Sequence, residues 1–155
     1  MHPVFEEGVR WLRAQLPGGL DNRFSWGDSR LGNILFDGTR CAAITDFENA
    51  AVAPAEFDLG WWLMFDRTQH ECVGIERLPG EPSREEQREI YARFAGRPIG
   101  DTHYHEVLGA MRYTAIVVRV MNRAEERAFI PPDHEIWLRN PASACLADLL
   151  GMARP

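Results

Sequence analysis

The chain has 155 residues, 45% of them hydrophobic, and this size predicts a single domain over residues 1–155 with a sizeable core. The formal net charge is −6, and the arginines are scattered instead of forming the basic stripe that nucleic-acid-binding proteins carry. No apolar run reaches the roughly 18 residues of a membrane span, and the three cysteines are too widely spaced to indicate disulfides or zinc. We therefore expect a cytoplasmic protein that binds neither nucleic acid nor a membrane.

The first third of the chain predicts a helix followed by a β-hairpin. Residues 3–16 place their apolar side chains on one helical stripe, which indicates an amphipathic helix. Two short apolar runs, 33–36 and 41–45, flank the turn sequence Asp-Gly-Thr-Arg at 37–40, a combination typical of a hairpin. Residues 25–32, which precede the hairpin, are expected to form a loop.

The rest of the chain predicts helices. Residues 55–67 are apolar nearly all round, which indicates a buried helix, and Trp61 and Trp62 are interpreted as core residues instead of a ligand platform. Ser83 and Glu86 form a capping box for a peripheral helix that ends before Gly96. A long helix over residues 101–126 should pack against the core.

Three features of this C-terminal part complete the expectations. Asn140 and Pro141 should begin a last helix that ends at Gly151. Arg112, Arg119 and Arg123 are expected on a solvated face of the long helix. The histidines at 70, 103 and 105 lack the spacing of metal ligands on a shared helix face and are interpreted as surface residues.

The predicted order of elements is helix, loop, hairpin and then helices only. No strands alternate with helices along the chain, as they would in a parallel sheet. The expected fold class is therefore mainly α (α+β): a helical bundle with a small β-hairpin that carries a polar loop.

Carboxylate and amide side chains gather around this hairpin. Asp28 and Asn33 are five positions apart on the loop, and Asp46 follows the second strand, thirteen positions after Asn33. Two strands of about five residues joined by a tight turn return the chain to its starting level, so Asn33 and Asp46 should lie close together. Their oxygens are ligands that Mg²⁺ prefers, and the three residues together suit phosphoryl transfer.

The segments WGDSRLGNILF (26–36) and ITDFENA (44–50) resemble the HxDxxxxN motif and downstream aspartate of aminoglycoside phosphotransferases, choline kinases and, more distantly, protein kinases. The resemblance implies a protein-kinase-like C-terminal lobe. It further implies that Asp28 is the catalytic base or orients the acceptor hydroxyl, and that Asn33 and Asp46 are magnesium ligands.

Other site residues follow from the same resemblance. Arg30 stands where the family has a catalytic-loop lysine, which implies a contact with the γ-phosphate of the nucleotide. Glu48 matches an acidic residue that assists the metal or its waters. Asp58 matches an aspartate that hydrogen-bonds the catalytic loop, although a first-turn residue favoured by the helix dipole explains it equally well. Trp26 replaces the usual histidine and is expected to brace the loop by packing.

The sequence departs from the family in one large respect. The first half of a kinase, with its phosphate-covering loop and nucleotide-gripping lysine, has no counterpart, and all 17 basic residues are arginine. An N-terminal nucleotide-gripping lobe is therefore expected to be absent, and the chain alone is expected to be inactive.

Two hypotheses follow. The first is the catalytic lobe of a phosphotransferase that uses Mg²⁺ and moves the γ-phosphate of ATP or GTP to a hydroxyl of an aminoglycoside-like or other polar small molecule. The second is a non-catalytic, truncated lobe that acts as a binding module or forms a homodimer through its exposed cleft face.

Overall fold

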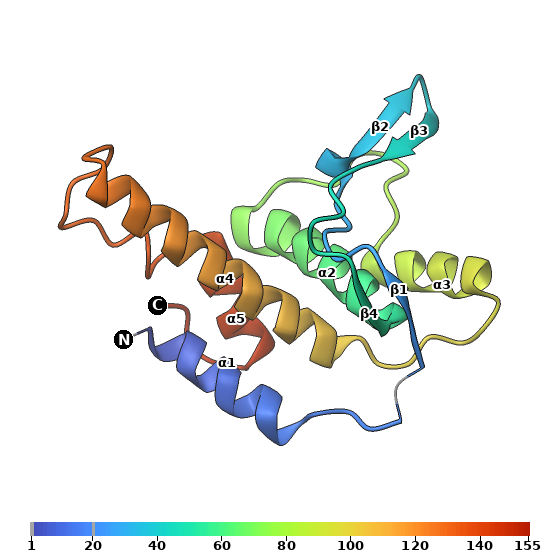
Figure 1. Cartoon of the computed structure of the whole chain (residues 1–155), viewed down its shortest axis with the longest axis horizontal. Coiled ribbons are helices and arrows are strands. Elements are labelled where there is room, and N and C mark those ends of the chain that lie inside the picture. Colours follow the sequence, from blue (N-terminus) through green and yellow to red (C-terminus); the bar gives the residue numbers. More distant parts are fainter. Residues whose placement is uncertain (1, 20) are drawn as a thin grey trace.

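The computed structural model describes residues 2–19 and 21–155, and these form five α-helices and four short strands (Figure 1). The helices are α1 (Pro3–Ala14), α2 (Ala55–Arg67), α3 (Arg84–Ala95), α4 (His103–Glu126) and α5 (Pro141–Leu149). The strands are β1 (Asn22–Ser25), β2 (Ile34–Asp37), β3 (Arg40–Ile44) and β4 (Ala51–Pro54). A 3₁₀ turn, Leu31–Asn33, precedes β2, and a π-helical turn, Thr68–Val73, continues α2. The fold is helix-rich with small antiparallel sheets, as the sequence predicts.

Local signals in the sequence explain where the helices begin. Both hydrogen bonds of the predicted capping box between Ser83 and Glu86 are present at the start of α3. The Asn140 side chain caps α5 by accepting a hydrogen bond from the Ser143 backbone N–H at 3.0 Å. Among the described residues, no helix is both long and apolar enough to cross a membrane.

The core lies where α1, α2, α4 and α5 meet. Its largest fully buried apolar side chains come from three of these helices and are Leu63, Met64, Val107, Cys145 and Leu146. Helices α2 and α4 approach closely at Gly60, where an added Cβ would lie 2.5 Å from the Cβ of His105. His105 is buried at this crossing, so its interpretation as a surface residue is wrong.

Only the first half of α4 packs against the core. Val107, Ala110 and Thr114 are fully buried, but Ala115 and Val120 are exposed. The helical stripe continues in the sequence beyond the point where α1 and α5 cover it. The prediction that the whole of residues 101–126 packs against the core is therefore wrong for the second half.

The described strands form two separate antiparallel pairs. The predicted hairpin is confirmed as β2 and β3, with Ile34 opposite Ile44 and an irregular register after Leu35. The pair β1 and β4 was not predicted: Asn22 lies opposite Pro54, and Ser25 lies opposite Ala51. Each of these strands is only four residues long, and their partners are far apart in sequence, so no local signal announces them. Figure 1 shows the β2–β3 hairpin projecting away from the helices.

Candidate active site

The loop between β1 and β2 is fastened to the first turn of α2 by Asp58. The Asp58 carboxylate accepts hydrogen bonds from the backbone N–H groups of Trp26 and Gly27, each at 2.7 Å. The Ser29 hydroxyl donates to the Asp58 backbone carbonyl, also at 2.7 Å. Asp58 also stands in the first turn of its helix, so the two interpretations of this residue are compatible. The loop is thus fixed to the helical core at three points.

Gly27 allows the loop to pass against the segment between the two sheets. Its φ of 87° lies in the left-handed region, which residues with a Cβ rarely adopt. A Cβ at this position would lie 2.0 Å from the Asn49 carbonyl oxygen. Glycine is therefore required here by both backbone conformation and space.

The Asp28 carboxylate is held by three donors. Trp61 Nε1 donates to Oδ1 at 2.9 Å, while Arg30 Nε and Asn33 Nδ2 donate to Oδ2 at 3.0 and 2.7 Å. Trp61 is 3% exposed, so the predicted core position is correct, but its indole nitrogen also reaches the loop. The carboxylate is thus fixed in orientation by neighbours from the loop and from α2.

Arg112 of α4 lies behind this loop, and its expected place on a solvated face is wrong. Its Nη2 donates to the Gly27 carbonyl at 3.2 Å, and its guanidinium carbon lies 4.5 Å from the ring centre of Trp61. Burial lowers the pKa of Arg112, and the nearby carboxylates of Asp28 and Asp58 oppose this shift. An arginine stays protonated in proteins, so it places a positive charge beside both carboxylates.

A sequence signal for Arg112 did exist. It stands four residues after the inward-facing Leu108, so it lies at the edge of the apolar stripe of α4. Charged residues are rarely buried without a partner, so this position indicated that Arg112 has one, but the sequence did not identify the partner.

The two ends of the hairpin are tied together beside the loop. The Asn33 carbonyl accepts hydrogen bonds from the backbone N–H of Thr45 at 2.9 Å and from its hydroxyl at 3.1 Å. Trp26 Nε1 donates to the carbonyl of Thr45 at 2.8 Å and to that of Asp46 at 3.2 Å. Trp26 therefore connects the loop to the hairpin through hydrogen bonds, where packing alone was expected.

Asp46 and Glu48 lie on the exposed side of the site. Asp46 has a φ of 61°, an unusual backbone conformation that occurs often at functional positions and that Asp and Asn tolerate best. No described residue donates a hydrogen bond to either carboxylate. Because Asn33 Nδ2 is directed at Asp28, the Asn33 amide oxygen is also left free among the described residues. These groups are hard oxygen donors of the kind that suits Mg²⁺.

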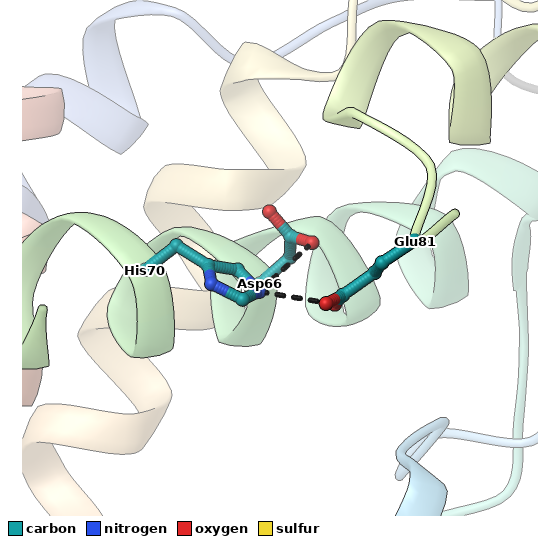
Figure 2. Close-up of side chains that lie close together, drawn as sticks. All are labelled: Asp66, His70 and Glu81. Carbon is teal, nitrogen blue, oxygen red and sulfur yellow. Dashed lines mark hydrogen bonds and ion pairs between the residues drawn. The ribbon is translucent and has the colours of Figure 1, made fainter. Parts of the chain in front are cut away.

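A second polar cluster, in α2 and the segment that follows it, contains Asp66, His70 and Glu81 (Figure 2). His70 Nε2 lies 3.1 Å from Glu81 Oε1 and 3.9 Å from Asp66 Oδ1, and His70 Nδ1 lies 2.7 Å from the Ile75 carbonyl oxygen. His70 is largely enclosed by these partners, so its interpretation as a surface residue is wrong.

Comparison with known proteins identifies the family. The sequence model of the phosphotransferase enzyme family matches residues 2–108, a range that contains the loop, the hairpin and α2. The crystal structure of a Ralstonia eutropha JMP134 protein, described as a candidate aminoglycoside phosphotransferase, matches with a TM-score of 0.68 and 25% sequence identity. The match covers 100% of this chain and 46% of that protein, so the chain spans about half the length of this relative. The chain belongs to the phosphotransferase enzyme family.

Proposed function

We propose that this chain carries the hydroxyl-orienting and magnesium-binding side of an enzyme that moves the γ-phosphate of ATP or GTP to a hydroxyl group of a small molecule. The observation that carries the proposal is the Asp28 carboxylate, held by Trp61, Arg30 and Asn33 beside the base of the hairpin. Phosphoryl transfer depends mainly on positioning and on charge stabilisation, and both are available here.

Asp28 would orient the acceptor hydroxyl and take its proton. Its orientation is set before any substrate binds, which lowers the entropic cost of reaching the reactive geometry. Arg30 uses only Nε to bind Asp28, and no described residue bonds its two terminal nitrogens. Those nitrogens could grip the oxygens of a transferred phosphoryl group in the bidentate manner that suits arginine.

Asn33 and Asp46 would hold the magnesium ion, with Glu48 assisting through the ion's waters. A bound Mg²⁺ would neutralise charge that develops between the phosphate groups. The support for this assignment is the free oxygen donors on both sides of the hairpin base, joined through Thr45.

Calorimetric titration of the chain with ATP or GTP in the presence of Mg²⁺ tests the proposal. We expect heat of binding that depends on the metal and falls sharply in Asp46→Asn, because asparagine tolerates the same backbone conformation but lacks the charge. The matched control is Asp37→Asn, since Asp37 is an exposed aspartate in the hairpin turn that pairs with Arg40. Equal heats in wild type and Asp46→Asn would contradict the metal assignment.

A second candidate function is a non-catalytic lobe that associates with itself. The observation that favours it is a group of exposed apolar side chains on the strands: Phe24, Leu35, Phe36, Ile44 and Val52. Such a lobe would give no heat with nucleotide and Mg²⁺. It would sediment as a dimer that Phe36→Asp converts to a monomer, whereas a monomeric wild type would rule this candidate out.

A further inference from the structure

A cavity of about 640 Å³ lies between α2, α3 and residues 29–32 of the loop. Its volume is in the range of small-molecule sites in proteins. One end is formed by Ser29, Arg30 and Gly32, so it reaches the immediate neighbours of Asp28. The walls are mainly apolar and aromatic side chains from the two helices: Leu59, Trp62, Phe65, Ile90, Tyr91 and Phe94.

The aromatic side chains of the cavity leave apolar surface uncovered. Trp62 Nε1 donates to Gln87 Oε1 at 2.6 Å, which holds the indole ring between the two helices. On α3, Phe94 is 86% exposed, and Ile90 is also exposed. A held indole ring beside uncovered apolar surface favours a flat apolar ligand, because binding removes that surface from water.

The carboxylates on the cavity walls already have partners. Asp58 is bonded to the backbone of the loop, and Arg77 bonds both oxygens of Asp66, one of which also accepts a hydrogen bond from Gln87 at 2.7 Å. Glu81 faces His70 Nε2 (Figure 2). The wall therefore offers no unpaired anion, among the described residues, for an ammonium group of a ligand.

The groups of this cluster are occupied by one another. His70 Nδ1 lies 2.7 Å from the Ile75 carbonyl oxygen, and Nε2 lies 3.1 Å from Glu81 Oε1. The Arg77 guanidinium bonds both oxygens of Asp66. With Arg77 on both oxygens of Asp66, we assign this cluster to structure and not to a metal site.

We propose that this cavity binds the phosphoryl acceptor and that the acceptor is an uncharged alcohol with an aromatic or fused-ring body, not a polycationic aminosugar. The proposal rests on the proposed phosphotransferase function. The ring system would lie between Trp62 and Phe94, with its hydroxyl at the Arg30 end of the cavity. The acceptor oxygen would bond to the γ-phosphorus, its proton would pass to Asp28, and the P–O bond to the departing nucleoside diphosphate would break.

The test measures binding to the 155-residue chain without nucleotide or metal. The probes are 2-(2-naphthyl)ethanol and kanamycin, each followed by calorimetry and saturation-transfer NMR. We expect the naphthyl alcohol to bind, and Phe94→Asp to weaken it by roughly tenfold or more, because a charge replaces apolar contact. Phe129→Asp is the matched control, since Phe129 is 76% exposed in a different part of the surface. It should leave the affinity unchanged.

Several outcomes would overturn the proposal. These are tighter binding of kanamycin than of the naphthyl alcohol, equal affinity in Phe94→Asp and wild type, and loss of binding in Phe129→Asp. The substituted side chains are exposed, so circular dichroism should show intact folds. The acceptor titration contains neither nucleotide nor Mg²⁺, so failure of the acceptor proposal and failure of the nucleotide titration are distinguished.

Discussion

The helical part of the molecule and the strand region (residues 22–54) contain similar apolar side chains, but these are buried in the helical part and exposed in the strand region. Leu63, Met64 and Leu146 are fully buried between helices, whereas Phe24 and Val52 of the strands are 74% and 78% exposed. The candidate site lies at the junction. Asp28 is oriented from the helical side, by Trp61 and through Asp58, whereas Asp46 and Glu48 stand on the exposed strand side. The proposed hydroxyl-orienting half of the site is therefore supported by the core, and the proposed metal-binding half depends on a few hydrogen bonds.

The largest expected effect comes from the residue at the junction itself. In a complete enzyme that contains this lobe, Asp28→Asn should lower phosphotransfer from ATP to an acceptor alcohol by about 10²- to 10⁴-fold, since it removes the proposed base and places an amide against the donors Asn33 and Arg30. Label transferred from γ-³²P-ATP measures the rate. Asp37→Asn is the control for charge loss on the same side of the molecule. Undiminished turnover in Asp28→Asn would remove Asp28 from the mechanism.

The packing of the helical part can be disrupted selectively at Gly60. In Gly60→Ala the new methyl group would lie 2.5 Å from His105 Cβ and 2.7 Å from its backbone carbon, so α2 and α4 must separate. We expect a loss of about 3 kcal/mol in the free energy of unfolding, measured by urea denaturation. Gly100→Ala is the matched control, because no described residue has an atom within 4 Å of a Cβ there. A wild-type midpoint for Gly60→Ala would show that the helices do not approach this closely.

The strand side can be disturbed at Gly27 with a smaller effect on global stability. Gly27→Ala must displace either the loop or the Asn49 carbonyl, so hydrogen exchange at the Trp26 and Gly27 amides should accelerate while the helical amides stay protected. Gly38 also has a positive φ, 62°, but no described atom lies within 4 Å of a Cβ there, so Gly38→Ala reports the cost of backbone strain without a steric clash. Equal exchange in the two variants would mean that the contact with Asn49 does not hold the loop.

The sequence predicted the helices and the hairpin well because their signals are local. The capping pairs at Ser83 and Asn140 and the turn at 37–40 are read within a few residues of the element they begin. The loop residues Asp28 and Asn33 share one such segment. Because the two residues are close in sequence, their proximity could be predicted, and the structure shows a hydrogen bond of 2.7 Å between them.

What the sequence could not predict depends on contacts between distant segments. Arg112 lies 85 positions after Gly27, and its place behind the loop follows from how α4 crosses α2. The segments of β1 and β4 form strands only because they pair with each other. The enclosed position of His70 likewise depends on Glu81, which the chain brings back after a turn. Burial and pairing of this kind are set by the tertiary fold and leave little trace in local spacing.

The smallest expected effect concerns the charge cluster on the helical side. Burial alone would raise the pKa of Asp66, but hydrogen bonds from Arg77 and Gln87 and the Arg77 charge outweigh it and lower the pKa. A lowered folded-state pKa stabilises the protein above the unfolded pKa of about 3.9, and this contribution is lost as the pH falls through the folded value. Arg77→Met should therefore cost about 1–2 kcal/mol at pH 7, because Asp66 keeps its burial and loses its partner.

The pH dependence of that cost distinguishes the cluster from an ordinary surface ion pair. Urea denaturation from pH 7 to pH 3 should show wild type and Arg77→Met converging as Asp66 is protonated. Arg40→Met, which breaks the exposed pair with Asp37, should cost almost nothing at any pH. If Arg77→Met also leaves the free energy of unfolding unchanged at pH 7, then Asp66 is solvated in the cavity wall. Its carboxylate would then be available to a cationic ligand. The helical side would in that case hold an exposed, unpaired charge, as the strand side does at Asp46 and Glu48 within the part of the chain that the structure describes.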